Sequence, residues 1–237
     1  MKTLTRKNAS VDLLNGPILK SMLTFAIPIF LSGIFQQLYN TMDTVIIGHT
    51  LGDEALAAMG AAAAIFDLLT GFALGIGSGP AIVTARSFGS GDEEQLKRSV
   101  AAALVIGVCV TTVITIGIRF ILYPFLEILH TPSEIIGESY AYISTITLFI
   151  GVMFAYNLCA GLLRAIGNSE MPLVFLIFSS LLNIGLDLFF IKQLHMGVRG
   201  AAVATVIAQA ISVAACLLYI GKRAKMLIPQ KKAFCPG

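Results

Sequence analysis

Long apolar runs constrain this chain more than any other feature of its sequence. A helix needs about 20 predominantly apolar residues to cross the hydrocarbon of a bilayer. The chain contains such runs in succession, separated only by short polar stretches. Because lipid offers the backbone no hydrogen-bond partners, runs of this length predict membrane-spanning helices. We expect an all-α, polytopic membrane protein with six spans, at residues 18–47, 55–83, 99–126, 138–163, 171–192 and 197–221.

The composition argues against several classes of protein. Of the 237 residues, 57% are apolar and 12% are charged, whereas soluble domains carry about 25% charged residues. A soluble enzyme, a disordered chain and a nucleic-acid-binding protein all need more polar surface, so no nucleic-acid partner is expected. The first apolar run is far longer than a signal-peptide core, which predicts a retained span. The four cysteines lack the spacing of a metal site or a disulfide framework.

The basic residues predict the orientation of the spans, because cytoplasmic segments are enriched in Lys and Arg. A cytoplasmic N-terminus places thirteen of these residues inside and leaves Arg119, Lys192 and Arg199 outside. We therefore expect both termini to be cytoplasmic. The expected organisation is a tail over residues 1–17, a six-helix transmembrane lobe over residues 18–221, and a basic tail or interlobe linker over residues 222–237. The last segment has no closing element, and we expect the chain to be half of a longer protein.

Three of the expected spans carry a polar stripe along one helical face. Residues three, four or seven positions apart share such a face. Lipid does not tolerate polar stripes, so we expect them to line one shared interior. The stripes consist of Gln36, Asn40 and Asp43 in the first span, Ser179 or Ser180 with Asn183 and Asp187 in the fifth, and Thr205, Gln209 and Ser212 in the sixth.

The stripes meet at one depth in the membrane. At about 1.5 Å of rise per residue, Asp43 and Asp187 both fall towards the outer ends of their spans. Thr205 lies in the outer half of the sixth span, and Tyr140 and Tyr142 lie at the outer start of the fourth. Two carboxylates crowded in a medium of low dielectric constant cannot both ionise cheaply.

Such a pair either holds a proton or binds a small cation with help from Asn183 and nearby hydroxyl oxygens. Sodium suits hard oxygen ligands of this kind, and no other metal is indicated. The alternative is a hydrogen-bonded clamp between helices that binds no ion.

Other polar and small residues within the spans leave further possibilities open. Asp67, in the middle of the second span, either lines a cavity or bonds a neighbouring helix. Gly71, Gly75 and Gly79 recur every four residues, which predicts close packing of helices. The chain has no GxSxG or HExxH motif and no nucleophile beside an acid–base pair, so an enzyme is not expected.

Several segments resemble the multidrug and toxic compound extrusion (MATE) transporters, in order along almost the whole chain. The first is LYNTMDTVIIG at residues 38–48, and ALAAMG follows at residues 55–60. The others are ARSFGSGD at residues 85–92, LRAIGNSEMP at residues 163–172, NIGLD at residues 183–187 and GVRGAAVAT at residues 197–205.

This resemblance implies a fold and a set of functional residues. MATE transporters consist of two six-helix lobes, and this chain resembles the N-terminal lobe. The family exports cationic amphipathic drugs and toxins by antiport with H⁺ or Na⁺, and needs no cofactor. The resemblance places the cation site at Asp43, Asn183, Asp187 and Thr205, with Tyr142 or Tyr140 as a further member. It also identifies Pro28 as the point at which the first helix bends when the cation binds.

The predicted function is therefore a cation-coupled antiporter in the plasma membrane of a bacterium, of which this chain is the half that carries the cation site. Small organic cations are the expected substrates, and the bilayer and a missing C-terminal lobe or a second copy are the expected partners. Gln36, Asn40, Ser180, Gln209 and Asp67 are the expected polar lining of its cavity. The alternatives are a flippase for lipid-linked sugars, which needs a more basic cavity, and a non-transporting membrane assembly subunit.

Overall fold

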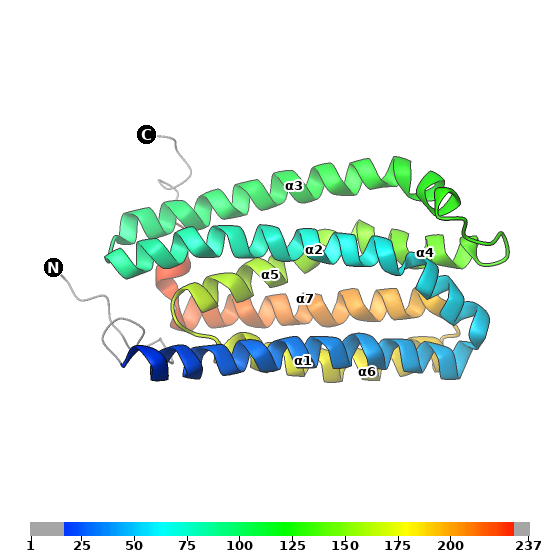
Figure 1. The fold of residues 1–237 in the computed structure, drawn as a ribbon, viewed down its shortest axis with the longest axis horizontal. Helices are drawn as coiled ribbons and strands as arrows, with labels where there is room; N and C mark the ends of the chain where they lie inside the picture. The colour runs from blue at the N-terminus through cyan, green and yellow to red at the C-terminus, as the bar shows by residue number, and fades with distance from the viewer. Residues whose placement is uncertain (1–16, 230–237) are drawn as a thin grey trace.

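The computed structural model describes residues 17–229, and this part of the chain contains helices and no strands. Seven α-helices run side by side in one elongated bundle (Figure 1). They are α1 (Ile18–Leu51), α2 (Asp53–Ser90), α3 (Glu93–Ile128), α4 (Ile136–Leu148), α5 (Ile150–Ala165), α6 (Glu170–Leu188) and α7 (Gly197–Arg223), with a π-helical turn η2 (Phe189–Gln193) and a 3₁₀ turn η3 (Lys225–Leu227). Most of the two expected tails, residues 1–16 and 230–237, lies outside the described residues.

The helices correspond to the six spans predicted from the apolar runs. Five helices are each long and apolar enough to cross a membrane, and α4 and α5 together form a sixth, bent span. The start of α1 and the end of α7 lie at the same end of the bundle, as an even number of spans requires (Figure 1). The predicted all-α membrane fold is confirmed.

The fourth span is broken where the sequence contains no proline. The chain bends by 50° between α4 and α5. Just before the break, Thr145 Oγ1 donates to Ala141 O at 2.8 Å and Thr147 Oγ1 donates to Ile143 O at 2.7 Å. Hydroxyl groups that bond the carbonyl four residues earlier bend helices, and Gly151 follows immediately.

The first helix, by contrast, continues through its proline. α1 is one helix of 34 residues with Pro28 inside it. Proline removes a backbone donor from the helix interior. The hydroxyl of Ser32, one turn later, donates to Pro28 O at 2.7 Å.

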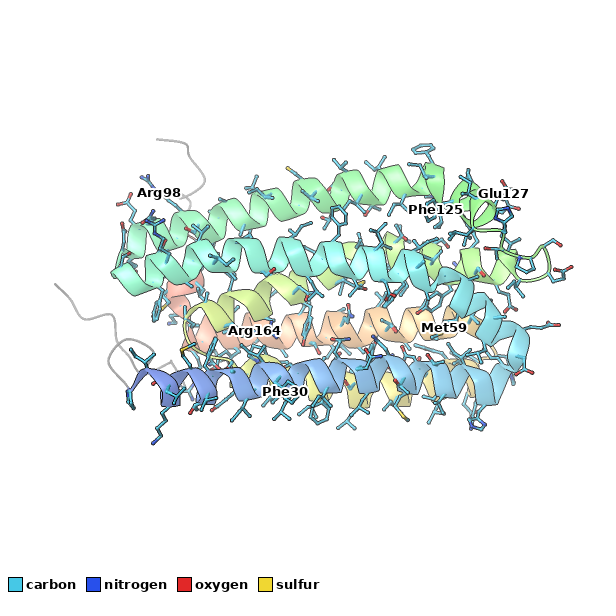
Figure 2. All side chains as sticks on the ribbon, in the orientation of Figure 1. Phe30, Met59, Arg98, Phe125, Glu127 and Arg164 are labelled. Atoms are coloured by element: carbon cyan, nitrogen blue, oxygen red, sulfur yellow. The ribbon has the colours of Figure 1, made fainter. Side chains whose placement is uncertain are left out.

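Charged and apolar side chains divide the surface as a bilayer requires. Figure 2 shows Arg98 at one end of the bundle and Glu127 at the other. At the first end, Arg98 pairs with Glu94 at 2.8 Å. Between the ends, large apolar side chains such as Phe30 and Phe120 are exposed on the outside of the bundle.

Two glycines allow a close backbone approach between α2 and α5. A Cβ atom at Gly161 would lie 2.7 Å from the carbonyl oxygen of Gly77. Within the described residues, a Cβ at Gly71, Gly75 or Gly79 would meet nothing within 4 Å. The prediction of close packing through those three glycines was therefore wrong. The contact lies on the face of α2 that carries Gly77, because a shift of two residues turns a helix by about 200°.

Candidate functional site

Asp43 of α1 and Asp187 of α6 approach the same side-chain amide, that of Asn183. The amide orientation that satisfies its neighbours points its nitrogen towards both carboxylates. In that orientation the nitrogen donates to Asp43 Oδ1 at 2.7 Å and to Asp187 Oδ2 at 3.2 Å. In the same orientation, the amide oxygen lies 3.4 Å from the hydroxyl oxygen of Thr205 on α7. Three helices thus meet at one amide group.

This polar cluster is deeply buried. Asn183 and Asp187 are fully buried, Thr205 is 3% exposed and Asp43 is 6% exposed. The second carboxylate oxygen of Asp187, Oδ1, is buried and has no hydrogen-bond partner among the described residues. A buried carboxylate oxygen without a partner costs free energy. The donor set of carboxylate, amide and hydroxyl oxygens fits a proton or a small hard cation.

The sequence of α6 explains how its members reach the cluster. Leu176, Ser180, Asn183 and Asp187 recur every three or four residues and form the buried face of the helix. The π-helical turn η2 begins two residues after Asp187, and Leu194 N donates to Phe189 O at 3.2 Å within it. Turns of this kind concentrate at functional sites. The apolar pattern of the sequence does not predict this π-helical turn.

Tyr39 is a member of this neighbourhood that sequence reasoning missed. It is 5% exposed, and its hydroxyl is buried without a hydrogen-bond partner among the described residues. It precedes Asp43 by four residues, so both lie on the buried face of α1. This spacing of four residues from Asp43 is the sequence signal that identifies Tyr39.

The structure separates the two tyrosines that the sequence left as alternatives. Tyr142 is buried and lines a cavity together with Asp43. Tyr140 packs edge-to-face against Tyr123 of α3, with ring centroids 5.9 Å apart. Tyr142 is therefore the tyrosine beside the candidate site.

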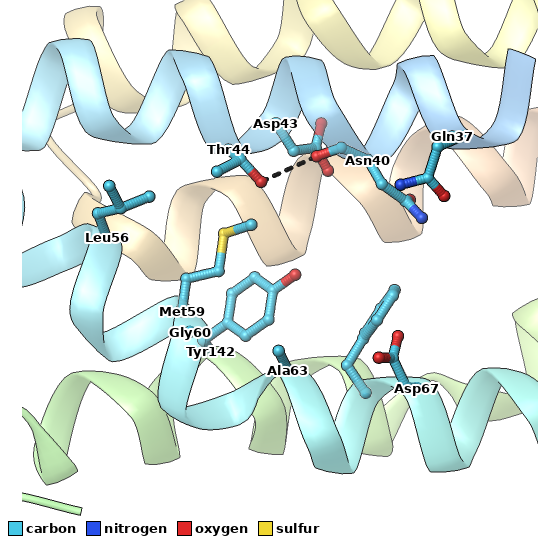
Figure 3. A pocket seen from close by; sticks show the side chains of 11 residues that line it. Gln37, Asn40, Asp43, Thr44, Leu56, Met59, Gly60, Ala63, Asp67 and Tyr142 are labelled. Atoms are coloured by element: carbon cyan, nitrogen blue, oxygen red, sulfur yellow. Dashed lines mark hydrogen bonds between the residues drawn. The ribbon is translucent and has the colours of Figure 1, made fainter.

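The cavity lies between α1 and α2 and has a volume of about 450 Å³. Figure 3 shows Asn40 and Asp43 on one wall, Asp67 on the facing wall, and the ring of Tyr142 between them. Two carboxylates and no basic residue are among its lining residues. The lining consists of Gln37, Asn40, Asp43, Thr44, Leu56, Met59, Gly60, Ala63, Phe66, Asp67 and Tyr142.

The expected lining and the observed lining overlap in part. Asn40 and Asp67 line the cavity, while Gln37 occupies the position expected for Gln36. Ser180 is buried, and its hydroxyl donates to Leu176 O at 2.9 Å on its own helix. Gln209 is half-buried and does not line this cavity, and its side-chain oxygen has no partner among the described residues.

Asp43 connects the cavity to the buried cluster. Of Asp43, Asn183, Asp187 and Thr205, only Asp43 is among the residues that line the cavity. One of its oxygens accepts from Asn183, on the side of the buried cluster. A ligand in the cavity and an ion in the cluster would therefore both act on the same carboxylate.

Comparison with known proteins supports the family resemblance found in the sequence. The MatE family model matches residues 28–189. A probable multidrug resistance protein of Bacillus subtilis, YpnP, is 30% identical over 215 residues, which cover 89% of this chain and 47% of the relative. The chain thus spans about half the length of the curated relatives it matches.

Solved structures give the same picture at the level of the fold. The outward-facing structure of a multidrug resistance MATE transporter matches with a TM-score of 0.88 and 26% identity, covering 96% of this chain and 50% of that one. The inward-facing structure of a multidrug resistance MATE transporter matches with a TM-score of 0.80 and 25% identity, over 85% of this chain and 46% of that one.

Proposed function

The chain belongs to the MATE family, and from that premise we propose that it is the ion-coupling lobe of an antiporter that exports organic cations in exchange for H⁺ or Na⁺. The observation that carries the proposal is the pair formed by Asp43 and Asp187 around the amide of Asn183, with one oxygen of Asp187 left without a partner. A buried pair of carboxylates that share one neutral donor is stabilised by a cation.

The ion step uses groups of three helices. A proton or Na⁺ that enters between Asp43 and Asp187 neutralises part of their charge and supplies the partner that Asp187 Oδ1 lacks. The amide nitrogen of Asn183 donates hydrogen bonds to both carboxylates, and the hydroxyl of Thr205 lies 3.4 Å from the other side of the same amide. Tyr142 contributes a buried aromatic ring to the cavity that Asp43 also lines.

Coupling follows because Asp43 belongs to both the cluster and the cavity. An ion bound to Asp43 makes the cavity less negative and weakens the binding of an organic cation there. By thermodynamic linkage, the organic cation weakens ion binding by the same factor. A tenfold effect in each direction corresponds to about 1.4 kcal/mol.

The movement that accompanies coupling would be a bend in α1. Pro28 lies inside α1, 15 residues before Asp43, which is about 22 Å along the helix. A proline leaves one carbonyl of the helix without its usual donor and so makes bending easier at that point. We expect ion binding at Asp43 to change the curvature of α1 at Pro28.

The transport pathway needs a second wall. The exposed faces of α1 and α2 carry Gln37, Thr41 and Asp67 between the ends of the bundle. Polar groups at this depth are costly against lipid. A second six-helix lobe, or a second copy of this chain, would cover that face and enclose the cleft. We place the assembly in the plasma membrane of a bacterium.

The lining of the cavity weighs against a lipid-linked sugar flippase. Such a substrate carries phosphate groups, which require Lys or Arg, and the lining residues include neither. The buried carboxylate pair beside a cavity favours a transporter over a non-transporting subunit, because ion binding explains why such a costly pair is present.

Ion binding by the purified chain tests the proposal directly. We would measure the uptake of radiolabelled Na⁺ and the release of protons by the parent chain, Asp43→Asn and the control Glu54→Gln, whose side chain is exposed in the first turn of α2. Ion binding that is lost in Asp43→Asn and kept in Glu54→Gln supports the proposal. Equal binding by all three chains contradicts it. Efflux of ethidium from vesicles under a pH gradient or a sodium gradient then identifies the ion.

A further inference from the structure

Asp67 is a carboxylate inside a membrane-spanning helix for which the ion cluster provides no explanation. It lies 14 residues after the start of α2, or about 21 Å along a helix of 38 residues. No hydrogen bond or ion pair joins it to another described residue. A carboxylate at such depth costs several kcal/mol in lipid and is rarely found there without a function.

The two faces of α2 determine where Asp67 points. Ala58, Ala62 and Ile65 form the face that is buried in the bundle. Asp67 shares the other face with Met59 and Ala63, and it is exposed. Figure 3 shows its carboxylate directed into the cavity, across from Asn40 and Gln37.

The surroundings of Asp67 suit an organic cation. Phe66 and Tyr142 contribute aromatic rings to the same cavity, and Met59 contributes a polarisable thioether. Aromatic faces attract cations, and the attraction grows when water is excluded. A volume of about 450 Å³ falls within the range of pockets for drug-sized ligands. No basic residue in the lining competes for the carboxylate.

We propose that Asp67 binds the positive charge of the exported molecule, so that α2 holds the substrate while the cluster at Asp43 holds the coupling ion. This inference rests on the proposed function and adds the residue that selects substrates by charge. The substrate class is an amphipathic monocation with aromatic surface, whose charge meets Asp67 and whose rings meet Phe66 and Tyr142.

The division between the two carboxylates follows from their surroundings. Asp43 is 6% exposed and shares the amide of Asn183, so its charge depends on the ion cluster. Asp67 is exposed to the cavity and has no such partner among the described residues. When an ion neutralises Asp43, the charge of Asp67 remains. Ion binding at Asp43 then weakens substrate binding without abolishing it.

Two probes of the same shape and opposite charge test this inference. Tetraphenylphosphonium is a monocation and tetraphenylborate a monoanion, and their binding to the purified 237-residue chain can be measured by equilibrium dialysis. We expect Asp67→Asn to weaken tetraphenylphosphonium binding at least tenfold and to strengthen tetraphenylborate binding. Asp67→Glu should stay within threefold of the parent for both probes. Glu54→Gln removes an exposed carboxylate from the first turn of the same helix and should change neither.

The possible results separate a binding role from a structural one. If Asp67→Asn binds tetraphenylphosphonium within twofold of the parent, the inference is overturned. If it loses both probes together, Asp67 shapes the cavity without selecting charge, and the inference is again overturned. Circular dichroism and gel filtration of each variant establish that it is folded before binding is compared.

The same assay distinguishes this inference from the proposed function. Adding Na⁺ or lowering the pH should weaken tetraphenylphosphonium binding in the parent chain and in Asp67→Glu. In Asp43→Asn this sensitivity to ions should disappear. If the parent itself shows no sensitivity to ions, the coupling proposed at Asp43 fails, while the comparison at Asp67 still decides where the positive charge binds.

Discussion

Asn183 holds Asp43 of α1 and Asp187 of α6 together, through hydrogen bonds of 2.7 Å and 3.2 Å from one amide nitrogen. The position of α1 relative to α6 is therefore linked to the charge on both carboxylates. A change in that charge alters the strength of both bonds at once, since hydrogen bonds to a charged acceptor are about twice as strong as those to a neutral one.

Replacement of Asn183 by Leu should weaken ion binding and lower the stability of the protein. Leucine has a similar volume but no donor, so two buried carboxylates lose their shared partner. We expect Na⁺ or H⁺ binding to fall at least tenfold and the protein to lose about 1–3 kcal/mol of stability. Radiolabelled Na⁺ binding and thermal unfolding in detergent measure the two effects. Unchanged ion affinity in Asn183→Leu would remove the amide from the site.

Thr205 should contribute through its hydroxyl group and not through its shape. Thr205→Val keeps the branched side chain and removes the oxygen that lies 3.4 Å from the Asn183 amide. We expect it to weaken ion binding threefold to tenfold, whereas Thr205→Ser, which keeps the hydroxyl, should stay within twofold of the parent. Competition between Na⁺ and protons, followed by isothermal titration, compares the three chains. A loss in Thr205→Ser with none in Thr205→Val would mean that packing of the methyl group matters instead.

Replacement by alanine should affect ligand binding at Tyr142 and stability at Tyr140. Tyr142→Ala removes a wall of the cavity, and we expect the affinity for tetraphenylphosphonium to fall at least threefold. Tyr140→Ala removes the edge-to-face contact with Tyr123 and should cost about 1 kcal/mol of stability with little effect on binding. Equilibrium dialysis and thermal unfolding of both variants make the comparison. Weaker binding in Tyr140→Ala alone would contradict the placement of the two rings.

The contact between α2 and α5 should not tolerate a methyl group. Gly161→Ala places a Cβ atom 2.7 Å from the backbone oxygen of Gly77, and we expect a loss of about 1–3 kcal/mol from forced separation of the helices. Gly75→Ala is the matched control because a Cβ there meets nothing within 4 Å. The control should be neutral or more stable, by up to about 1 kcal/mol, since alanine favours helices. Melting temperatures of the two variants in one detergent test the difference.

The long apolar runs predicted the six spans because length and apolarity are sufficient to indicate a helix that crosses lipid. The break at Phe149 gave no such signal, because no proline marks it in the sequence. Two residues of the polar stripe predicted in α1, Asn40 and Asp43, line the cavity, but Gln37 lines it in place of Gln36. One residue turns a helix by about 100°, and the helix packing decides which of two adjacent side chains enters a cavity.

The choice between Tyr140 and Tyr142 shows a similar limit. Both lie at the outer start of one span, and only the contact of Tyr140 with Tyr123 on another helix assigns them to different places. The proximity of Asp43, Asn183 and Asp187 was predictable, in contrast. Carboxylate and amide side chains in a membrane span avoid lipid and therefore face the interior of the bundle.

The π-helical turn at Phe189–Gln193 has a consequence for how this region tolerates changes in chain length. A turn whose hydrogen bond spans five residues holds one residue more than an α-helical turn. Deleting a single residue from it would convert the turn to ordinary α-helix and leave the register of α6 unchanged. An ordinary helix offers no such freedom, because a deletion there rotates everything that follows. A single-residue deletion in this turn should therefore leave Asn183 and Asp187, which precede it, in place.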